Sequence, residues 1–208
     1  CLPAQEKAPA AGAHRTPEEI ETNYTRAIEG RTADILKALE LSDTNRSARV
    51  HDLILTQYRA LRGWHDANDP KLKAATGDTN AVARIRGSLK SLHDDFIAGL
   101  SAQLTPGQVE QVKDKMTYNK VKVTYDAYCE IIPGLTESQK AKMLDWLKEA
   151  REEAMDCGSA EEKSAVFNRY KGKINNYLTA QGHNVSQAHK DWAQKQKQKA
   201  AAKPAPPK

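Results

Sequence analysis

LTPGQ at residues 104–108 and LTESQ at residues 135–139 are two copies of one helix-start signal, and LSDTN at residues 41–45 is a weaker third copy. In each copy a hydroxyl can accept a hydrogen bond from the orphan N–H groups of the first turn, and an amide side chain can reach back. The leucine anchors the chain where the helix begins. Because apolar residues follow at spacings of three and four, these stretches predict helices.

Further start and stop signals divide the rest of the chain. TPEE at residues 16–19 and SAEE at residues 159–162 are capping boxes, and Gly182 has the place of a C′ residue. Residues 118–123 lose the helical period, which predicts an irregular segment. The predicted helices run over residues 16–39, 42–70, 78–100, 105–117, 125–132, 136–158 and 159–181, with a short last helix around residues 188–192.

Composition and length favour one helical domain. Ala, Lys, Glu and Gln are abundant and are strong helix formers, and 208 residues suit a single core. We therefore predict an all-α, single-domain multi-helix bundle built from helical hairpins. Residues 1–15 are expected to form a flexible tether, residues 16–198 the helical domain, and residues 199–208 a disordered tail rich in Lys, Ala and Pro.

The positive charge is confined to one end of the chain. Residues 190–208 hold six Lys and one Asp, which accounts for the whole net charge of +5 and leaves the body neutral. A neutral body has no basic face that could collect phosphates, so nucleic acid is not expected as a partner.

Cys1 suggests an exported protein. A mature bacterial lipoprotein begins with a cysteine that carries lipid, and the stretch after Cys1 is rich in Ala and Pro, as a tether would be. This predicts a periplasmic or cell-surface protein, such as an outer-membrane lipoprotein, that touches the membrane only through lipid on Cys1. The alternative is that Cys1 is a remnant of a signal sequence or an arbitrary start.

Cys129 and Cys157 are predicted to be separate, buried thiols. A straight helix from residue 136 to Cys157 is about 30 Å long, and Cys129 lies just before its start. A disulfide requires Cα atoms within about 7 Å.

The LTxxQ stretches resemble those of the Spy-like periplasmic chaperones, small helical proteins that cradle unfolded clients. That resemblance implies a chaperone or scaffold role. The neutral body lacks the cationic cradle of that family, and the same motif is also an ordinary capping box.

A longer resemblance spans residues 33–188. The matching stretches are residues 57–61, 104–118, 123–125, 146–156 and 170–178. They are similar to a family of exported bacterial proteins of unknown function that has been described as sugar-binding. The resemblance implies the fold and an exported setting, and it makes a carbohydrate the expected ligand.

The residue chemistry allows a sugar site. Aromatic faces cover the C–H surfaces of sugar rings, and amides, carboxylates and Arg bind the hydroxyls. Five of the seven Tyr lie between residues 118 and 177, and the irregular segment 118–125 is the expected pocket wall. The alternative is that these Tyr are edges of the core and the charges are solvated. The candidate ligand-binding residues are Trp64, Tyr118, Asn119, Tyr125, Arg151, Lys171 and Asn175.

Motifs for catalysis, metals and cofactors are lacking, so no metal or cofactor is predicted. His-Asp pairs recur at residues 51–52, 65–66 and 93–94, but His51 and His65 are about 21 Å apart along one helix face and cannot share a metal. A glycan-active enzyme, a lyase or hydrolase using Tyr, Arg and Lys, stays an alternative to simple binding.

Overall fold

The computed structural model describes residues 16–201, which form helices and no strands. The helices are α1 (Pro17–Leu39), α2 (Thr44–Ala74), α3 (Thr79–Ser101), α4 (Pro106–Met116), α5 (Lys120–Ile131), α6 (Glu137–Met155), α7 (Ala160–Ala180) and α8 (Val185–Ala201). The predicted all-α class is confirmed. The predicted lipidation site Cys1, the tether and residues 202–208 of the predicted tail lie outside the described residues.

Four of the predicted helix starts are confirmed in detail. Thr16, Thr105, Thr136 and Ser159 each accept a hydrogen bond from the third residue of the helix, whose side chain returns one to the cap. In the weaker signal the predicted hydroxyl cap was wrong, because the cap is Asp43, whose carboxylate accepts from the Arg46 N–H. Gly182 follows α7 with a φ of 91°, as a C′ glycine does.

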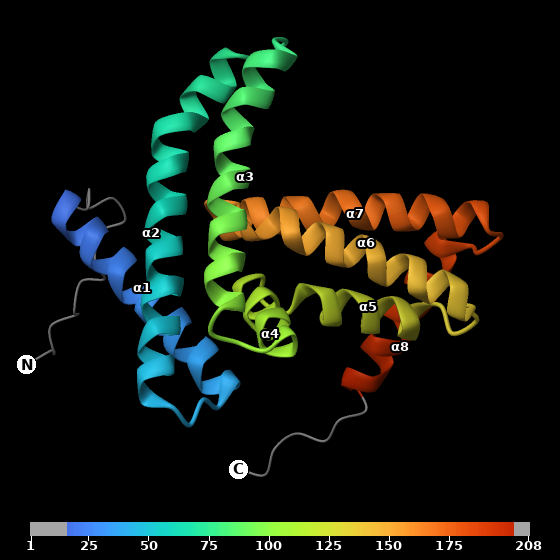
Figure 1. Ribbon diagram of the computed structural model, residues 1–208. Coiled ribbons are helices and arrows are strands. Elements are labelled where there is room, and N and C mark those ends of the chain that lie inside the picture. The colour runs from blue at the N-terminus through green and yellow to red at the C-terminus, as the bar shows by residue number, and fades with distance from the viewer. Residues whose placement is uncertain (1–15, 202–208) are drawn as a thin grey trace, which may run out of the picture.

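One predicted boundary was wrong. α2 does not end near Pro70 but continues to Ala74, and Figure 1 shows it curving at this end. The proline removes the hydrogen bond to the Asp66 carbonyl and its ring crowds that carbonyl, which this exposed part of the helix accommodates by curving. At the other end of the chain, α8 runs from Val185 to Ala201 and is longer than the short helix predicted around residues 188–192, because its Ala, Lys and Gln favour helix.

The irregular segment is also shorter than predicted. α5 begins at Lys120, so irregular backbone is confined to residues 117–119, where Tyr118 (φ 58°) and Asn119 (φ 53°) are left-handed. The helical period of α5 could not be recognised in the sequence, because the apolar residue Val123 points outward and is 63% exposed. Val121, Thr124 and Tyr128 form the buried face instead.

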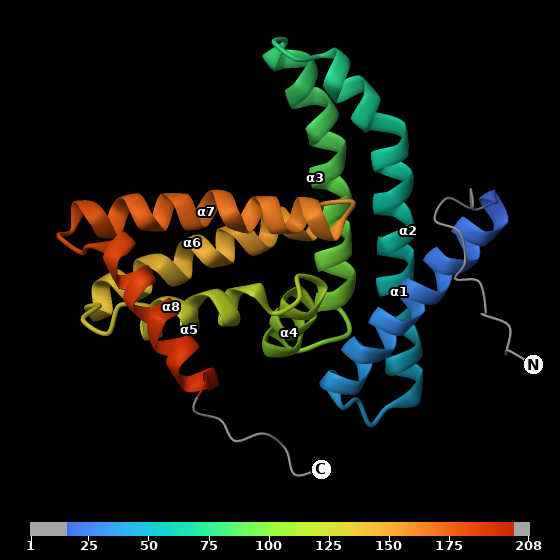
Figure 2. The same cartoon turned by 180° about the vertical axis from the view of Figure 1, so that it is seen from behind.

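Two helical hairpins extend in different directions from a shared junction. The α2–α3 hairpin stands upright in Figure 1, and the α6–α7 hairpin extends sideways from it. α4 and α5 lie beneath α6, and α1 crosses α2. The view from behind shows α8 crossing the outer part of α5 (Figure 2). Within residues 16–201, no helix is long and apolar enough to cross a membrane.

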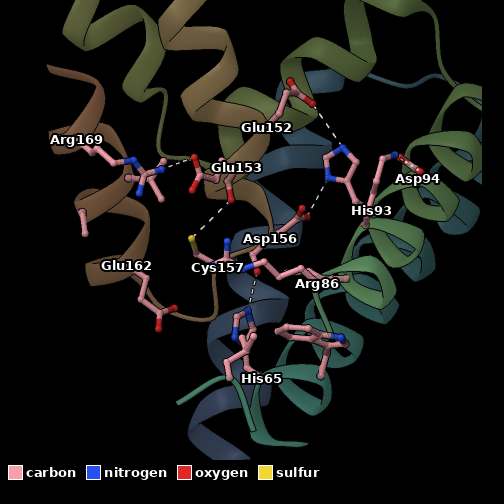
Figure 3. A pocket seen from close by; sticks show the side chains of 16 residues that line it. His65, Arg86, His93, Asp94, Glu152, Glu153, Asp156, Cys157, Glu162 and Arg169 are labelled. Atoms are coloured by element: carbon pink, nitrogen blue, oxygen red, sulfur yellow. Dashed lines mark hydrogen bonds and ion pairs between the residues drawn. The ribbon is translucent and has the colours of Figure 1, made fainter. Parts of the chain in front are cut away.

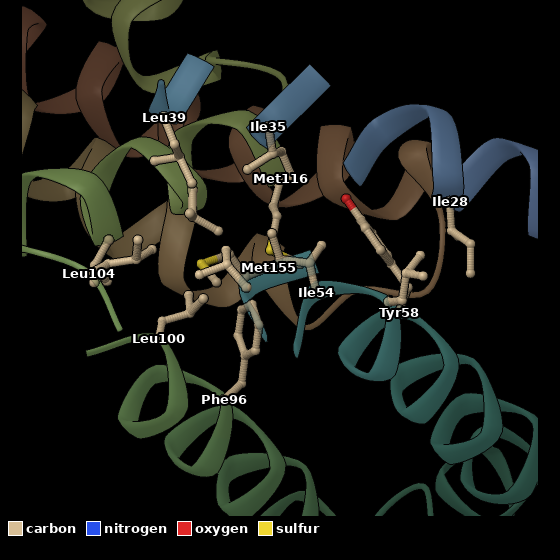
Figure 4. Close-up of a cluster of buried hydrophobic side chains, with 14 residues drawn as sticks. Ile28, Ile35, Leu39, Ile54, Tyr58, Phe96, Leu100, Leu104, Met116 and Met155 are labelled. Atoms are coloured by element: carbon tan, nitrogen blue, oxygen red, sulfur yellow. The ribbon is translucent and has the colours of Figure 1, made fainter. Parts of the chain in front are cut away.

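Buried apolar side chains form two clusters. The first joins α1 to α4 around Ile28, Ile54 and Leu100 (Figure 4), and the second joins α5 to α8 around Leu147 and Phe167. Met155 of α6 belongs to the first cluster, so α6 ties the two together. Cys129 and Cys157 are free, as predicted, but half-buried instead of buried.

The outer half of the α2–α3 hairpin is not covered by the core. Phe96 and Leu100 of the α3 stripe are buried, whereas Val82, Ile85 and Leu89, nearer the tip, are only half-buried. The apolar stripe of α3 therefore continues past the core along one side of an open corner between the two hairpins.

Candidate functional site

A cavity of about 740 Å³ occupies the corner between the two hairpins (Figure 3). We call it the hairpin cleft. The end of α2 and the middle of α3 form one wall, and the end of α6 and the first half of α7 form the other. The side chains lining it are Trp64, His65, Leu72, Arg86, Leu89, Lys90, His93, Asp94, Glu152, Glu153, Asp156, Cys157, Glu162, Ala165, Val166 and Arg169.

The turn between α6 and α7 is pressed against α2. A Cβ atom on Gly158 would lie 3.1 Å from the ring carbons of His65, a tight contact that would require the His65 ring to move slightly, so glycine at position 158 favours this close approach. The close approach places Asp156 between the two helices of the α2–α3 hairpin.

Asp156 is the point at which both helices of that hairpin are attached. His93 of α3 lies with Nδ1 2.9 Å from the Asp156 carboxylate, and His65 of α2 lies with Nε2 2.7 Å from the Asp156 carbonyl oxygen. Figure 3 shows the two imidazoles converging on this residue.

Both histidines are biased toward the protonated form. The hydrogen bond with Asp156 raises the pKa of His93 despite the opposing effect of burial. Burial lowers the pKa of His65, but the hydrogen bonds to Asp156 and Asp69 outweigh it, so the pKa is raised. Both His65 nitrogens face acceptors, since Nδ1 is 3.0 Å from Asp69, and only the imidazolium can donate to both.

The stability of this attachment should depend on pH. Since the folded pKa of His93 is above its usual value, its contribution is complete below about pH 6.5 and is lost as the pH rises through the folded pKa. We expect the free energy of unfolding to fall over this range, and to fall less in His93→Gln. Urea denaturation at a series of pH values measures this, and parallel profiles for the two proteins would contradict it. His65 and His51, whose pKa values are also raised, account for the residual slope.

Neighbouring residues hold several side chains of the cleft in place. Glu152 accepts from Lys113 Nζ at 2.9 Å and also lies 3.6 Å from His93 Nε2. Glu153 pairs with Arg169 across the α6–α7 hairpin. Trp64 donates its Nε1–H to Ser88 at 2.8 Å, which fixes the indole against α3. The cleft therefore has an oriented aromatic ring beside several fixed carboxylates.

The seven predicted ligand-binding residues do not gather around one cavity. Trp64 lines the hairpin cleft, and Tyr118 and Asn119 line a different cavity beside α1. Tyr125 packs against the second hydrophobic cluster. Lys171 and Asn175 lie one turn apart on α7, where Tyr128 Oη is 3.2 Å from the Lys171 carbonyl and 2.5 Å from Asn175 Oδ1. Whether these residues bind sugar stays a prediction.

Arg151 is occupied by the protein itself. It is 3% exposed and binds Glu110 at 2.6 Å, Asp114 at 2.7 Å and Glu152 at 3.1 Å. The pairs with Glu110 and Asp114 join α6 to α4. They raise the pKa of the guanidinium above its usual range, although burial opposes this. The geometry of Arg151 is that of a residue that holds α6 and α4 together.

His65, His93 and Asp156 were missed as cleft residues, although the sequence contained a partial signal. The His-Asp dipeptides drew attention to both histidines, but Asp94 pairs with Lys90 at 2.5 Å, not with His93. The partner of His93 is 63 residues away in the chain. Among the described residues, no three His, Cys, Asp or Glu side chains are placed to hold a metal ion.

The fold and the cleft define an all-α protein in which two helical hairpins enclose a cleft lined by both charged and apolar side chains. The chain belongs to the family described as Protein of unknown function (DUF3826), whose model matches residues 25–198. This confirms the expected family of unknown function. No curated protein matches the sequence, and neither comparison supports a likeness to Spy-like chaperones or a sugar-binding description.

Proposed function

We propose that the hairpin cleft binds a carbohydrate. Its volume of about 740 Å³ is in the range of small-ligand sites. The observation that carries the proposal is the presence of the Trp64 indole in one cavity with carboxylates and Arg86. An aromatic face suits the C–H surface of a sugar ring, while carboxylates accept from its hydroxyls and a guanidinium donates to them.

The charge of the cleft favours a neutral sugar. Five carboxylates line it, together with three Lys or Arg side chains and the imidazoles of His65 and His93, whose raised pKa values favour the charged form. Lys90 and Arg169 are already paired with Asp94 and Glu153. A ligand with its own carboxylate would find no excess of positive charge in the cleft, so neutral oligosaccharides are the expected ligands.

Trp64→Ala should weaken binding of a neutral oligosaccharide by about tenfold, or about 1.4 kcal/mol, because it removes the aromatic face. Isothermal titration calorimetry with a panel of neutral oligosaccharides measures this. Trp64→Phe, which keeps a ring, should lose less. Trp146→Ala serves as a matched control, since Trp146 packs against Tyr177 outside the cleft. Absence of heat with every neutral oligosaccharide, or equal affinity of Trp64→Ala and the wild type, would refute the proposal.

One feature of the cleft favours a second function, cleavage of the bound glycan. His93 is held by Asp156 through Nδ1 while its Nε2 lies 3.6 Å from Glu152, so an imidazole and a carboxylate face the same cavity. Such a pair can serve as general acid and base. Chromatography of the oligosaccharides after incubation distinguishes the two functions. Cleavage predicts new products that His93→Gln abolishes, and unchanged sugars leave binding alone.

A further inference from the structure

Two adjoining cavities lie between α1, α2, the α4–α5 turn and the α6–α7 turn. Their volumes are about 530 Å³ and 640 Å³, and Arg31, Tyr58 and Tyr118 line both. Because the same three side chains line both cavities, the cavities form one surface, which we call the tyrosine groove. Cys157 lines both this groove and the hairpin cleft, so the two sites meet at the α6–α7 turn.

Cations outnumber carboxylates in the tyrosine groove, unlike in the cleft. Arg31, Arg62 and Lys163 line the first cavity with one carboxylate, Glu161. The second cavity adds two further Lys and one Asp, namely Lys37, Lys115 and Asp34. The first turn of α7 also lines the groove, and the partial positive charge of a helix start acts in the same direction.

Lys163 is a buried cation without a carboxylate partner. It is 5% exposed, and its Nζ donates to the carbonyl oxygens of Ala154 at 3.0 Å and Met155 at 3.3 Å. Two of three N–H groups are thereby used. Among the described residues, no carboxylate forms an ion pair with it. Burial lowers its pKa to about 8, since the charge has lost its water. An anion in the groove would supply the missing countercharge.

Arg31 and Tyr118 form the opposite part of the groove. The Arg31 guanidinium carbon lies 5.9 Å from the centre of the Tyr118 ring, and within residues 16–201 it has no ion pair. Tyr118 is 40% exposed, on a left-handed backbone that costs about 1 kcal/mol or more for a residue with a Cβ. Arg62 differs, because Glu21 at 2.8 Å already balances its charge. Of the three cations that line the first cavity, Arg31 and Lys163 are therefore the two without an ion pair among the described residues.

We propose that the tyrosine groove binds an acidic glycan, with the carboxylate or sulfate of the sugar near Arg31 and Lys163 and a sugar ring against Tyr118. Tyrosine faces suit sugar rings, and Arg and Lys with few acids beside them select an anionic group. This deepens the proposed carbohydrate function, on which it rests, by adding a second site with the opposite charge preference.

The primary test uses an oligogalacturonate, which carries carboxylates, and a sulfated oligosaccharide, with calorimetry on the whole chain. Arg31 is exposed, so Arg31→Gln should fold normally and weaken binding by about tenfold. Arg84→Gln, the same change at an exposed position of α3, should bind like the wild type. Whichever of the two ligands loses affinity in Arg31→Gln identifies the anionic group. Unchanged affinity for both in Arg31→Gln overturns the proposal.

Two comparisons distinguish glycan binding in the groove from binding in the hairpin cleft and from unspecific binding of polyanions. Trp64→Ala should leave the acidic ligand unaffected, whereas it weakens the neutral one. If the protein binds neutral oligosaccharides but no acidic one, the proposal for the groove fails and that for the cleft stands. If it binds an acidic oligosaccharide in a way that depends on Arg31 but binds no neutral one, the proposal for the cleft fails and that for the groove stands. A single-stranded deoxyoligonucleotide of similar charge serves as a polyanion control. If it binds as tightly and with the same dependence on Arg31, the groove does not select glycans and the proposal fails.

The pH dependence gives an independent readout. Lys163 is faced by Arg31 of α1, Asp156 and Cys157 of the α6–α7 turn and Glu162 of α7. Tyr58 of α2 and Tyr118 line the same cavity. Burial raises the pKa of Cys157 to about 11 and of Tyr58 to about 12. As Lys163 loses its proton, affinity for the acidic ligand should fall by up to about tenfold per pH unit above pH 8. A flat profile between about pH 7 and pH 9.5 excludes Lys163 from the site.

Discussion

Arg151→Ala is expected to lower the free energy of unfolding by about 3 kcal/mol, because it removes a buried cation from three carboxylates. The value is at the lower end for a broken buried ion pair, since Glu110 and Asp114 keep 45% and 36% of their side chains exposed and can be rehydrated. For a chain of this size, that corresponds to a fall in Tm of about 9 °C. Thermal and urea denaturation measure it.

Arg169→Ala is the matched control for Arg151. Arg169 also pairs with a glutamate of α6, but its side chain is 60% exposed, so the loss should be under about 1 kcal/mol. The comparison also decides the role of Arg151, which the sequence favoured as a ligand-binding residue. If Arg151→Ala kept the wild-type stability and lost only sugar binding, the structural role would be wrong.

Phe167→Ala should lower the free energy of unfolding by about 4 kcal/mol, because Phe167 is 1% exposed in the second hydrophobic cluster and its loss leaves a large cavity. Phe167→Leu, which refills much of the space, should lose less. Urea unfolding followed by circular dichroism measures both variants.

The same experiment reports on how the two clusters are coupled. Since Met155 of α6 packs in the first cluster while Leu147 packs in the second, we expect one transition that shifts as a whole. Two separated transitions, of which only one moves in Phe167→Ala, would mean that the clusters unfold independently. A loss below about 1 kcal/mol would contradict the packing of Phe167 itself.

The helix starts were predictable because their interactions are local. Thr105 and Gln108 form a complete capping box from two residues three positions apart, and the same holds for Thr136 and Gln139. The errors arose where a local signal was weaker than assumed. Pro70 did not end α2, because it lies in an exposed part of the helix near its end, and Val123 hid the period of α5 by pointing outward.

The candidate binding residues were chosen by residue type, and the sequence did not show which of them lie together. Trp64, Tyr118 and Asn119 line cavities, but in two separate places. Arg151 has the chemistry of a ligand-binding residue, yet buried carboxylate contacts occupy it. Nothing in the sequence distinguishes an arginine paired with Glu110 from Arg31, which has no ion pair within residues 16–201, because the pairing depends on how α6 meets α4.

By itself the sequence determined the helices, because caps and apolar spacing act over about four residues and do not depend on the rest of the chain. Only the tertiary structure decided where the hairpin cleft and the tyrosine groove lie. The contacts that make the hairpin cleft join His93 and His65 to Asp156 across 63 and 91 residues. Such contacts exist only once helices have packed, as does the close approach of Gly158 to His65.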